Sequence, residues 1–227
     1  MRFIPVVLLA GVAFRLSADP YDPGPDLEAG RFLKVQAEAE VRLKQNPVDA
    51  LALAARSQAL SAQQRLGEAW NDARLALAVA PQGPVRAQAH LAMGLALAGT
   101  ALRERNLSSL GRAREALRNL EEATRQDPRL VRAWMSLGMA YQALPFVLGG
   151  SRSKAQECAY RLRTIDEAKG NALLGMLFRL DGKWTPAEAC FQRALERSPQ
   201  DVEVVALYLE ALGSREIRKV LGVEVQK

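Results

Sequence analysis

The sequence predicts an all-α protein built from antiparallel helix pairs. Hydrophobic residues recur with the 3.6-residue period of an amphipathic helix along most of the chain. Alanine and leucine, which both favour helices, are abundant. Similar segments also recur in a consistent order, and Pro47 precedes Pro81 by 34 residues. With 227 residues, of which 49% are hydrophobic, the chain is long enough for an array of such pairs to share a core.

Two half-motifs define the repeated unit. Trp134-x2-Leu137-Gly138-x2-Tyr141 lies on a first helix, and Ala187-x3-Phe191-x2-Ala194, followed by Pro199, lies on a second. Further copies of the two patterns contain Met93, Gly94 and Leu97; Leu174, Gly175 and Phe178; Ala69, Ala73, Ala76 and Pro81; and Ala116, Leu120, Ala123 and Pro128. Over about residues 27–222 the chain resembles the tetratricopeptide-repeat (TPR) family. The resemblance implies a right-handed α-solenoid of antiparallel helix pairs that binds other molecules and is not an enzyme.

The first eighteen residues predict a cleaved secretory signal. Arg2 precedes the uncharged, mostly apolar run 4–14, and Ala18 ends the segment as a cleavage site requires. The apolar run is too short to cross about 30 Å of hydrocarbon. A disordered or membrane-associated N-terminus is the alternative. A signal places the protein in the periplasm or outside the cell, and residues 19–26, with three prolines, predict an extended linker.

The predicted helices follow the linker in order within the solenoid domain 27–222, and residues 223–227 form a C-terminal tail. They cover residues 27–45, 48–62, 66–80, 84–100, 109–126, 130–143, 152–165, 168–180, 185–197, 201–213 and 214–222. Two stretches, Glu104–Leu110 and Pro145–Arg152, are insertions relative to the repeat and predict longer loops. Arg56 occupies a position that is usually apolar in the family, so the match of residues 50–83 to the repeat pattern is weaker than that of the other repeats.

Glycines are expected to play two different roles. Gly94, Gly138 and Gly175 lie on first helices, where small residues allow helix axes to approach to about 8–10 Å. The pair Gly149-Gly150 predicts a chain reversal that uses positive φ. We therefore expect Gly138→Leu, which forces a large side chain into a close helix contact, to be more damaging than Gly150→Ala, which changes only a local turn preference.

Nothing in the sequence predicts catalytic, metal-binding or cofactor-binding residues. His90 is the only histidine, lies in an apolar run and has no partner at a metal-binding spacing. Cys158 and Cys190 occupy equivalent positions in successive pairs, and we favour two unpaired, partly buried thiols over a disulfide. The net charge of +6 is spread among alternating basic and acidic residues, so a nucleic-acid partner is not expected.

The first helices carry almost no charge. Residues 88–100 and 134–144 have none, and residues 171–180 contain only Arg179. The TPR resemblance implies that first helices line the concave surface, where the inward positions would be Leu91, Leu95, Met135, Met139, Gln142, Leu173 and Met176. Such a groove predicts an apolar occupant. It could be a segment of the same chain, an apolar helix of a partner, or a lipid-like molecule.

These features lead to a functional hypothesis and one alternative. The hypothesis is a non-catalytic periplasmic or secreted scaffold that binds an unidentified protein or peptide segment in an apolar concave groove. The alternative is a small-molecule-binding or lipid-binding accessory of a TRAP-type solute transporter, because the TPR proteins associated with such transporters resemble this arrangement of a secreted solenoid with an apolar interior. The inward positions carry Leu, Ala and Met, with Gln58 and Gln142 as polar exceptions. Recognition of a C-terminal carboxylate through Lys and Asn is therefore not expected. No stable membrane span is expected.

Overall fold

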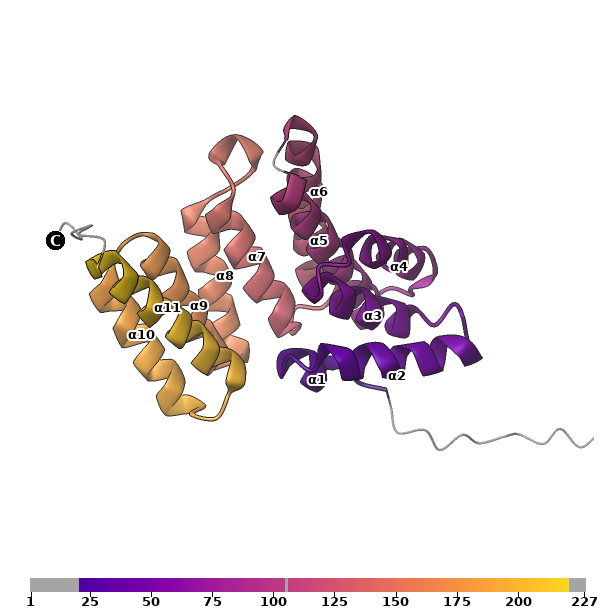
Figure 1. Ribbon diagram of the computed structural model, residues 1–227, viewed down its shortest axis with the longest axis horizontal. Coiled ribbons are helices and arrows are strands. Elements are labelled where there is room, and N and C mark those ends of the chain that lie inside the picture. The colour runs from indigo at the N-terminus through magenta and orange to yellow at the C-terminus, as the bar shows by residue number, and fades with distance from the viewer. Residues whose placement is uncertain (1–20, 105, 221–227) are drawn as a thin grey trace, which may run out of the picture.

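The computed structural model describes residues 21–104 and 106–220, and over these residues it is helical and contains no strand (Figure 1). This confirms the predicted fold class. The predicted signal (1–18), its cleavage site and the C-terminal tail (223–227) lie outside the described residues. The elements are α1 Gly24–Glu28, α2 Phe32–Gln45, α3 Ala50–Ala62, α4 Leu66–Val79, α5 Pro84–Glu104, α6 Leu107–Gln126, α7 Val131–Ala143, the 3-10 turn η1 Phe146–Leu148, α8 Arg152–Ile165, α9 Glu167–Leu180, α10 Trp184–Arg197 and α11 Val202–Val220.

The boundaries differ from the prediction in three places. The helix predicted over 27–45 is divided into α1 and α2 at Gly30, which has φ +70°, and α1 begins inside the predicted linker. The insertion at Glu104–Leu110 lengthens α5 and α6 instead of forming a long loop, and the Asn106 side chain caps α6 by accepting from the Ser109 N–H at 3.0 Å. The two helices predicted over 201–222 are one helix, α11, whose described part ends at Val220.

The helix contacts at the repeat glycines are as close as predicted. A Cβ on Gly138 would lie 2.8 Å from Leu173 Cδ2 and 3.3 Å from Cys158 Cβ. The corresponding distances are 2.8 Å to Leu120 at Gly94 and 2.9 Å to Phe191 at Gly175. A Cβ fits at none of these three positions unless its neighbour shifts. The largest core cluster extends from α5 to α10 across these contacts, and separate clusters lie among α2–α6 and among α9–α11.

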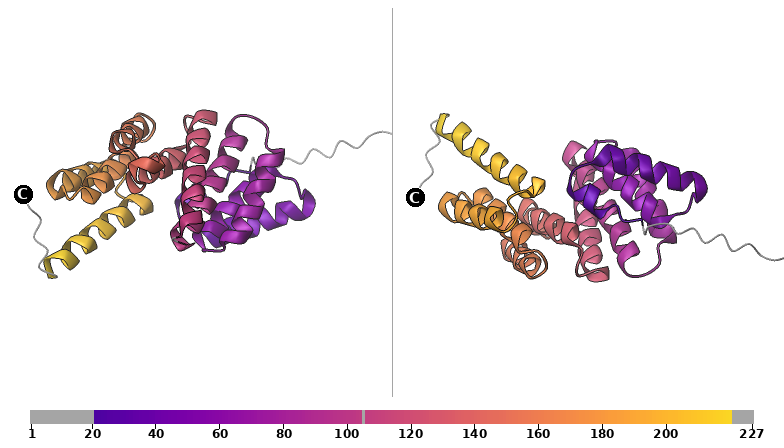
Figure 2. Two further views of the ribbon diagram at one scale, coloured as in Figure 1. Left: turned by 90° about the horizontal axis from the view of Figure 1, so that it is seen from above. Right: turned by 90° about the horizontal axis from the view of Figure 1, so that it is seen from below.

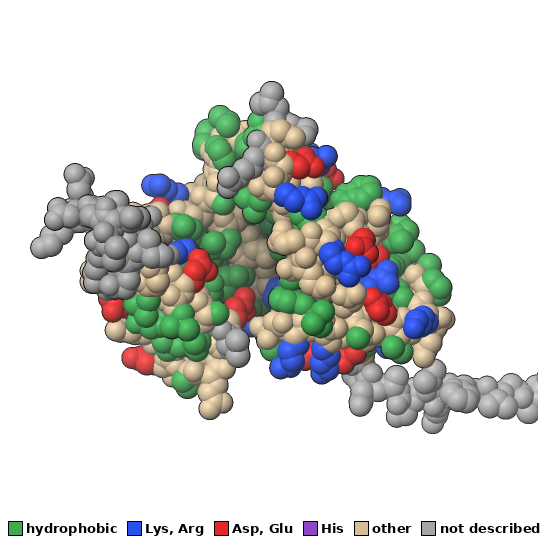
Figure 3. Space-filling view, in the orientation of Figure 1, with side chains coloured by type: hydrophobic (Ala, Val, Ile, Leu, Met, Phe, Trp, Pro, Cys, Tyr) green, Lys and Arg blue, Asp and Glu red, His purple; other side chains and the backbone are tan. Residues whose placement is uncertain are grey.

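Two lobes, α1–α6 and α7–α11, lie side by side in the solenoid (Figures 1 and 2). The first helices α3 and α5 pack against each other along their length, whereas α5 and α7 touch only slightly. The space-filling view shows a hollow between the lobes (Figure 3). The lobes diverge here, immediately after the repeat whose two helices the insertion has lengthened.

The turn between α7 and α8 corrects the prediction for the glycine pair. Gly149 has φ +98°, as expected, but Gly150 is not among the residues with positive φ. Gly150 is buried, and a Cβ on it would lie 1.7 Å from the carbonyl oxygen of Leu144. A side chain does not fit at the second glycine, so the premise that Gly150→Ala changes only a local turn preference is wrong.

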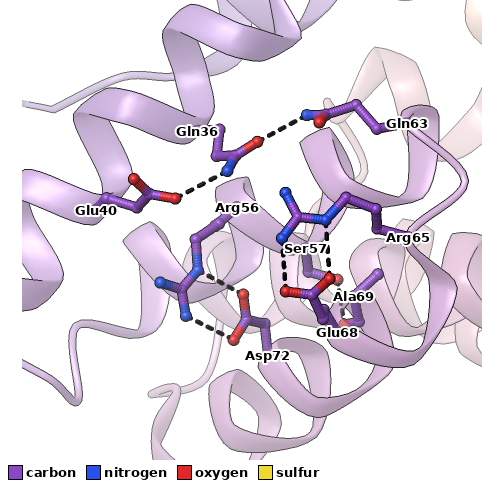
Figure 4. Close-up of polar contacts among 9 residues, drawn as sticks. All are labelled: Gln36, Glu40, Arg56, Ser57, Gln63, Arg65, Glu68, Ala69 and Asp72. Atoms are coloured by element: carbon purple, nitrogen blue, oxygen red, sulfur yellow. Dashed lines mark hydrogen bonds and ion pairs between the residues drawn. The ribbon is translucent and has the colours of Figure 1, made fainter.

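Arg56 keeps its place in the repeat through a buried partner on the next helix. Its guanidinium donates two hydrogen bonds to Asp72, at 2.6 and 2.8 Å, and Asp72 itself is buried (Figure 4). Next to it, the Ser57 hydroxyl donates to the Ala69 carbonyl at 2.7 Å, in the position where the other repeats have glycine. Because the buried Asp72 carboxylate pairs with the Arg56 guanidinium, this repeat accepts a charged side chain where its neighbours have an apolar one.

Candidate binding groove

One face of α7 is the candidate wall of the hollow between the lobes. Arg132, Met135, Met139 and Gln142 are three or four residues apart, which places them on the same side of the helix. All four are partly exposed, and the two methionines rest on the largest core cluster. We call these four residues the α7 groove face. In Figure 3 the wall of the hollow on the α7 side carries hydrophobic side chains.

The inward positions predicted from sequence divide into two groups. Met135, Met139 and Gln142 are accessible on α7, and Leu95 is partly exposed on α5. Leu91 and Leu173 are fully buried and Met176 is 3% exposed, so these three belong to the core. Neighbouring first helices cover them, and they do not line an accessible surface. The accessible apolar part of the groove is therefore narrower than the sequence suggested.

Hydrogen bonds hold both ends of the α7 groove face. At one end Arg132 Nη1 donates to Gln58 Oε1 of α3 at 2.6 Å, and Gln58 Nε2 donates to Gln88 Oε1 of α5 at 2.9 Å. At the other end Gln142 Nε2 donates to Asp181 Oδ1, just beyond α9, at 3.0 Å. Gln58 is 1% exposed and its amide joins the two lobes. The groove therefore has apolar side chains in the middle and polar groups at both ends.

A second polar cluster ties the lobes together at the end of the hollow near α1. The ammonium group of Lys169 on α9 is buried and lies 2.5 Å from Glu28 on α1, 3.4 Å from Glu203 on α11 and 4.0 Å from Asp201. Desolvation opposes the charge on Lys169, but the hydrogen bond to Glu28 and the field of Glu203 outweigh it and raise its pKa. Burial raises the pKa of Glu203 as well. We call these four residues the closing cluster.

The closing cluster shows which chain segment covers part of the groove. Figure 1 places α1 beside the lower ends of α7 and α11. A segment of the same chain therefore covers part of the groove, as one of the sequence alternatives proposed. The N-terminal helix α1 contributes Glu28, whereas the N-terminal end of α11 contributes Asp201 and Glu203. Helix α11 also packs Val204 and Ala211 in an apolar cluster with α9. The remainder of the hollow stays open in the space-filling view (Figure 3).

Sequence reasoning missed the two basic residues of the concave side. Arg132 and Lys169 each lie six residues before the glycine of their helix, Gly138 or Gly175, and Gln88 has the same spacing to Gly94. This common register could have revealed them. The prediction omitted them because it was based on the runs 134–144 and 171–180, and each basic residue lies two residues before one of these runs. Desolvation lowers the pKa of the Arg132 guanidinium, which lies close to no described carboxylate and feels Glu203 and Glu28 only at a distance.

The candidates for chemistry lie apart from the groove face. His90 Nδ1 is 2.9 Å from Asn119 Oδ1, between α5 and α6. Cys158 and Cys190 are free and buried, and burial raises the pKa of Cys158 to about 12, which makes its thiol a poor nucleophile. No group of three or more His, Cys, Asp or Glu residues that could hold a metal ion occurs in the described part of the chain. Across residues 21–104 and 106–220, the helices are too short or too polar to cross a membrane.

Comparison with known proteins supports the fold. The solved structures similar to this one include that of TTC0263, a thermophilic TPR protein in Thermus thermophilus, with a TM-score of 0.68 and 23% sequence identity over 83% of this chain and 95% of that one. The crystal structure of MamA aligns with a TM-score of 0.49 and 17% identity, over 80% of this chain and 98% of MamA. No protein-family model and no curated protein sequence matches the chain.

Proposed function

We propose that this chain, which has the TPR fold, is a non-catalytic scaffold that binds a segment of another protein along the α7 groove face. The observation that carries the proposal is the pair Met135 and Met139, which remain partly exposed on α7, whereas Leu91, Leu173 and Met176 on the neighbouring first helices are buried. Methionine suits this role because its flexible, polarizable side chain adapts to apolar partners.

The groove face suggests the chemistry of the bound segment. From Arg132 to Gln142 the face is about 15 Å long, since a helix rises by about 1.5 Å per residue. A short amphipathic helix or an extended segment can cover that length. Its apolar side chains would meet the methionines, and an acidic group would meet Arg132, whose hydrogen bond within the described residues is to the neutral Gln58.

Met139→Glu is expected to abolish capture of the partner while the protein stays folded. At a partly exposed position the new carboxylate can remain hydrated in the free protein, but an apolar partner would strip its water away. The measurement is thermal unfolding together with partner capture on the same preparation. Leu75→Glu on α4, at an outer position that is 44% exposed, serves as the matched control and should bind normally.

Two results would count against this site. Unfolding of the Met139→Glu variant would place Met139 in the core, and normal capture by a folded variant would place the partner elsewhere. The alternative ligand, a small apolar solute handled with a transporter, predicts a different outcome. In that case native mass spectrometry of the purified protein would show a retained molecule of low mass in place of a bound protein segment.

Export is the second part of the proposal, and it rests on the signal pattern of residues 1–18. Expression of the full-length chain in a bacterium should yield protein outside the cytoplasm whose N-terminal residue is Asp19. Replacing the apolar run by polar residues should keep the protein inside. Uncleaved protein that stays in the cytoplasm would contradict export and would leave the groove proposal untouched.

A further inference from the structure

The two insertions of the solenoid meet at one edge of the molecule. In Figure 1 the junction of α5 and α6 and the turn between α7 and α8 both lie at the top. They are joined directly, because Arg114 Nη2 on α6 donates to the Val147 carbonyl of the turn at 2.8 Å. Leu148 is buried, and a Cβ on Gly149 would lie 2.9 Å from Leu117 of α6. The turn is therefore seated on α6 in a fixed position.

This edge presents large apolar side chains to solvent. Phe146 is 88% exposed, Val147 75% and Leu102 71%, and Leu110 is 44% exposed one helical turn before Arg114. We call these four residues the insertion edge. Elsewhere in the described chain only Leu33 on α2, at 75%, reaches the exposure of Phe146, Val147 and Leu102, and Val48, Leu209 and Val41 follow at 62%, 60% and 57%. Exposure on this scale on adjacent tips usually marks an interaction surface.

The turn between α7 and α8 does not require exposed apolar side chains at positions 146 and 147 for its own stability. Its backbone is satisfied internally, because Leu148 N and Gly150 N donate to the Pro145 carbonyl at 2.9 and 3.1 Å, and Gly149 N donates to the Phe146 carbonyl at 2.9 Å. Leu148 provides the apolar anchor. Polar residues at positions 146 and 147 would leave all of these contacts in place, so the outward phenylalanine and valine stabilise nothing within the chain.

Positive charge is concentrated at the same edge. The described residues of the segments 101–118 and 144–155 include six arginines or lysines and two glutamates, in a chain whose net charge is +6. Arg103, Arg114 and Arg152 are exposed, although Arg152 lies 3.3 Å from Asp181, and Arg112 forms an ion pair with Glu104. Apolar tips with basic residues around them match an anionic lipid surface, where apolar side chains enter the acyl boundary and guanidinium groups meet phosphates.

We propose that the insertion edge docks the protein on an anionic membrane surface. The apolar residues stand on protruding tips, a shape that suits a soft interface into which they can penetrate. The contact is peripheral and involves the side chains of Leu102, Leu110, Phe146 and Val147. It is separate from the groove between the lobes, so the protein could hold a partner segment while it is bound to lipid.

Vesicle binding of the full chain tests the proposal. Wild-type protein should sediment with vesicles of phosphatidylglycerol and phosphatidylcholine, and should stay in solution with phosphatidylcholine alone. The double variant Phe146→Ser, Val147→Ser should lose this binding. Leu33→Ser, Val41→Ser on α2, at comparably exposed positions, is the matched control and should bind as wild type does. Thermal unfolding of all variants confirms that each is folded.

A site-specific measurement decides the outcome, since the apolar N-terminal segment could also contact lipid. A Phe146→Trp variant should gain fluorescence that brominated acyl chains quench in anionic vesicles, above the signal of the three native tryptophans. Quenching at position 146 supports the proposal even if a second contact keeps the serine variant bound. Absence of quenching, absence of wild-type binding, or equal binding to neutral vesicles would each overturn it.

Discussion

Gly150→Ala is expected to lower the free energy of unfolding by about 3 kcal/mol or more, which places it among the most damaging substitutions in the protein. The new Cβ would lie 1.7 Å from Leu144 O and 2.5 Å from Leu144 C, both of which are backbone atoms. A backbone carbonyl cannot move aside as the end of a side chain can. The turn also holds itself in place, because Ser151 N donates to the Tyr141 carbonyl at 2.9 Å.

Gly111→Ala is the matched control for this prediction. Gly111 is exposed within α6, and a Cβ on it would meet nothing within 4 Å. Because alanine is the better helix former, the control should gain about 0.5–1 kcal/mol. Urea unfolding of the two variants beside wild type measures both effects. If Gly150→Ala unfolds at the wild-type urea concentration, residues 144–151 do not adopt the described turn.

Lys169→Met is the second substitution with a large expected effect, a loss of about 3–5 kcal/mol. It removes the one cation that Glu28, Asp201 and Glu203 share, and leaves partly buried carboxylates without a partner. Lys44→Met on α2 is the exposed control and should change stability by less than about 0.5 kcal/mol. Thermal or urea unfolding at neutral pH gives the comparison.

The loss caused by Lys169→Met should shrink in acid. Burial raises the pKa of Glu203 above its usual value near 4.5, and Lys169 is the main group that opposes this. Without Lys169 the pKa rises further, so the folded variant binds a proton more readily than the unfolded chain does. The stability from that proton is present at low pH and is lost as pH rises through the folded-state pKa. Equal losses at acidic and neutral pH would mean that Glu203 is not buried beside Lys169.

Most helices could be predicted from the sequence because the residue spacing that indicates a helix lies within the helix itself. The spacing of Trp134, Leu137, Gly138 and Tyr141 marks one helix and its close contact, and the structure places Gly138 against Leu173 and Cys158. For the turn between α7 and α8, the sequence predicted the role of only one of the two glycines. The positive φ of Gly149 is a property of the turn itself, whereas the requirement at Gly150 arises from the Leu144 carbonyl.

The groove was harder to predict because it depends on contacts between distant residues. Lys169 and Glu28 are 141 residues apart, and no repeat pattern indicates that α1 returns to α9. Leu91 and Met176 share their repeat register with Met135 and Met139 on α7, yet both are buried. How far two first helices diverge is decided by packing along the whole stack, so exposure at an inward position cannot be inferred from register alone.

Photo-crosslinking from the groove tests the central claim most directly. A benzophenone amino acid is placed at position 139 on the α7 groove face, and in a separate variant at position 75 on the outer surface of α4. Irradiation in the cells that produce the protein should join position 139, but not position 75, to a distinct partner protein. A second substitution, Met135→Glu on the same face, should remove that product. Crosslinks that form equally from both positions, or from position 75 alone, would contradict binding in the groove.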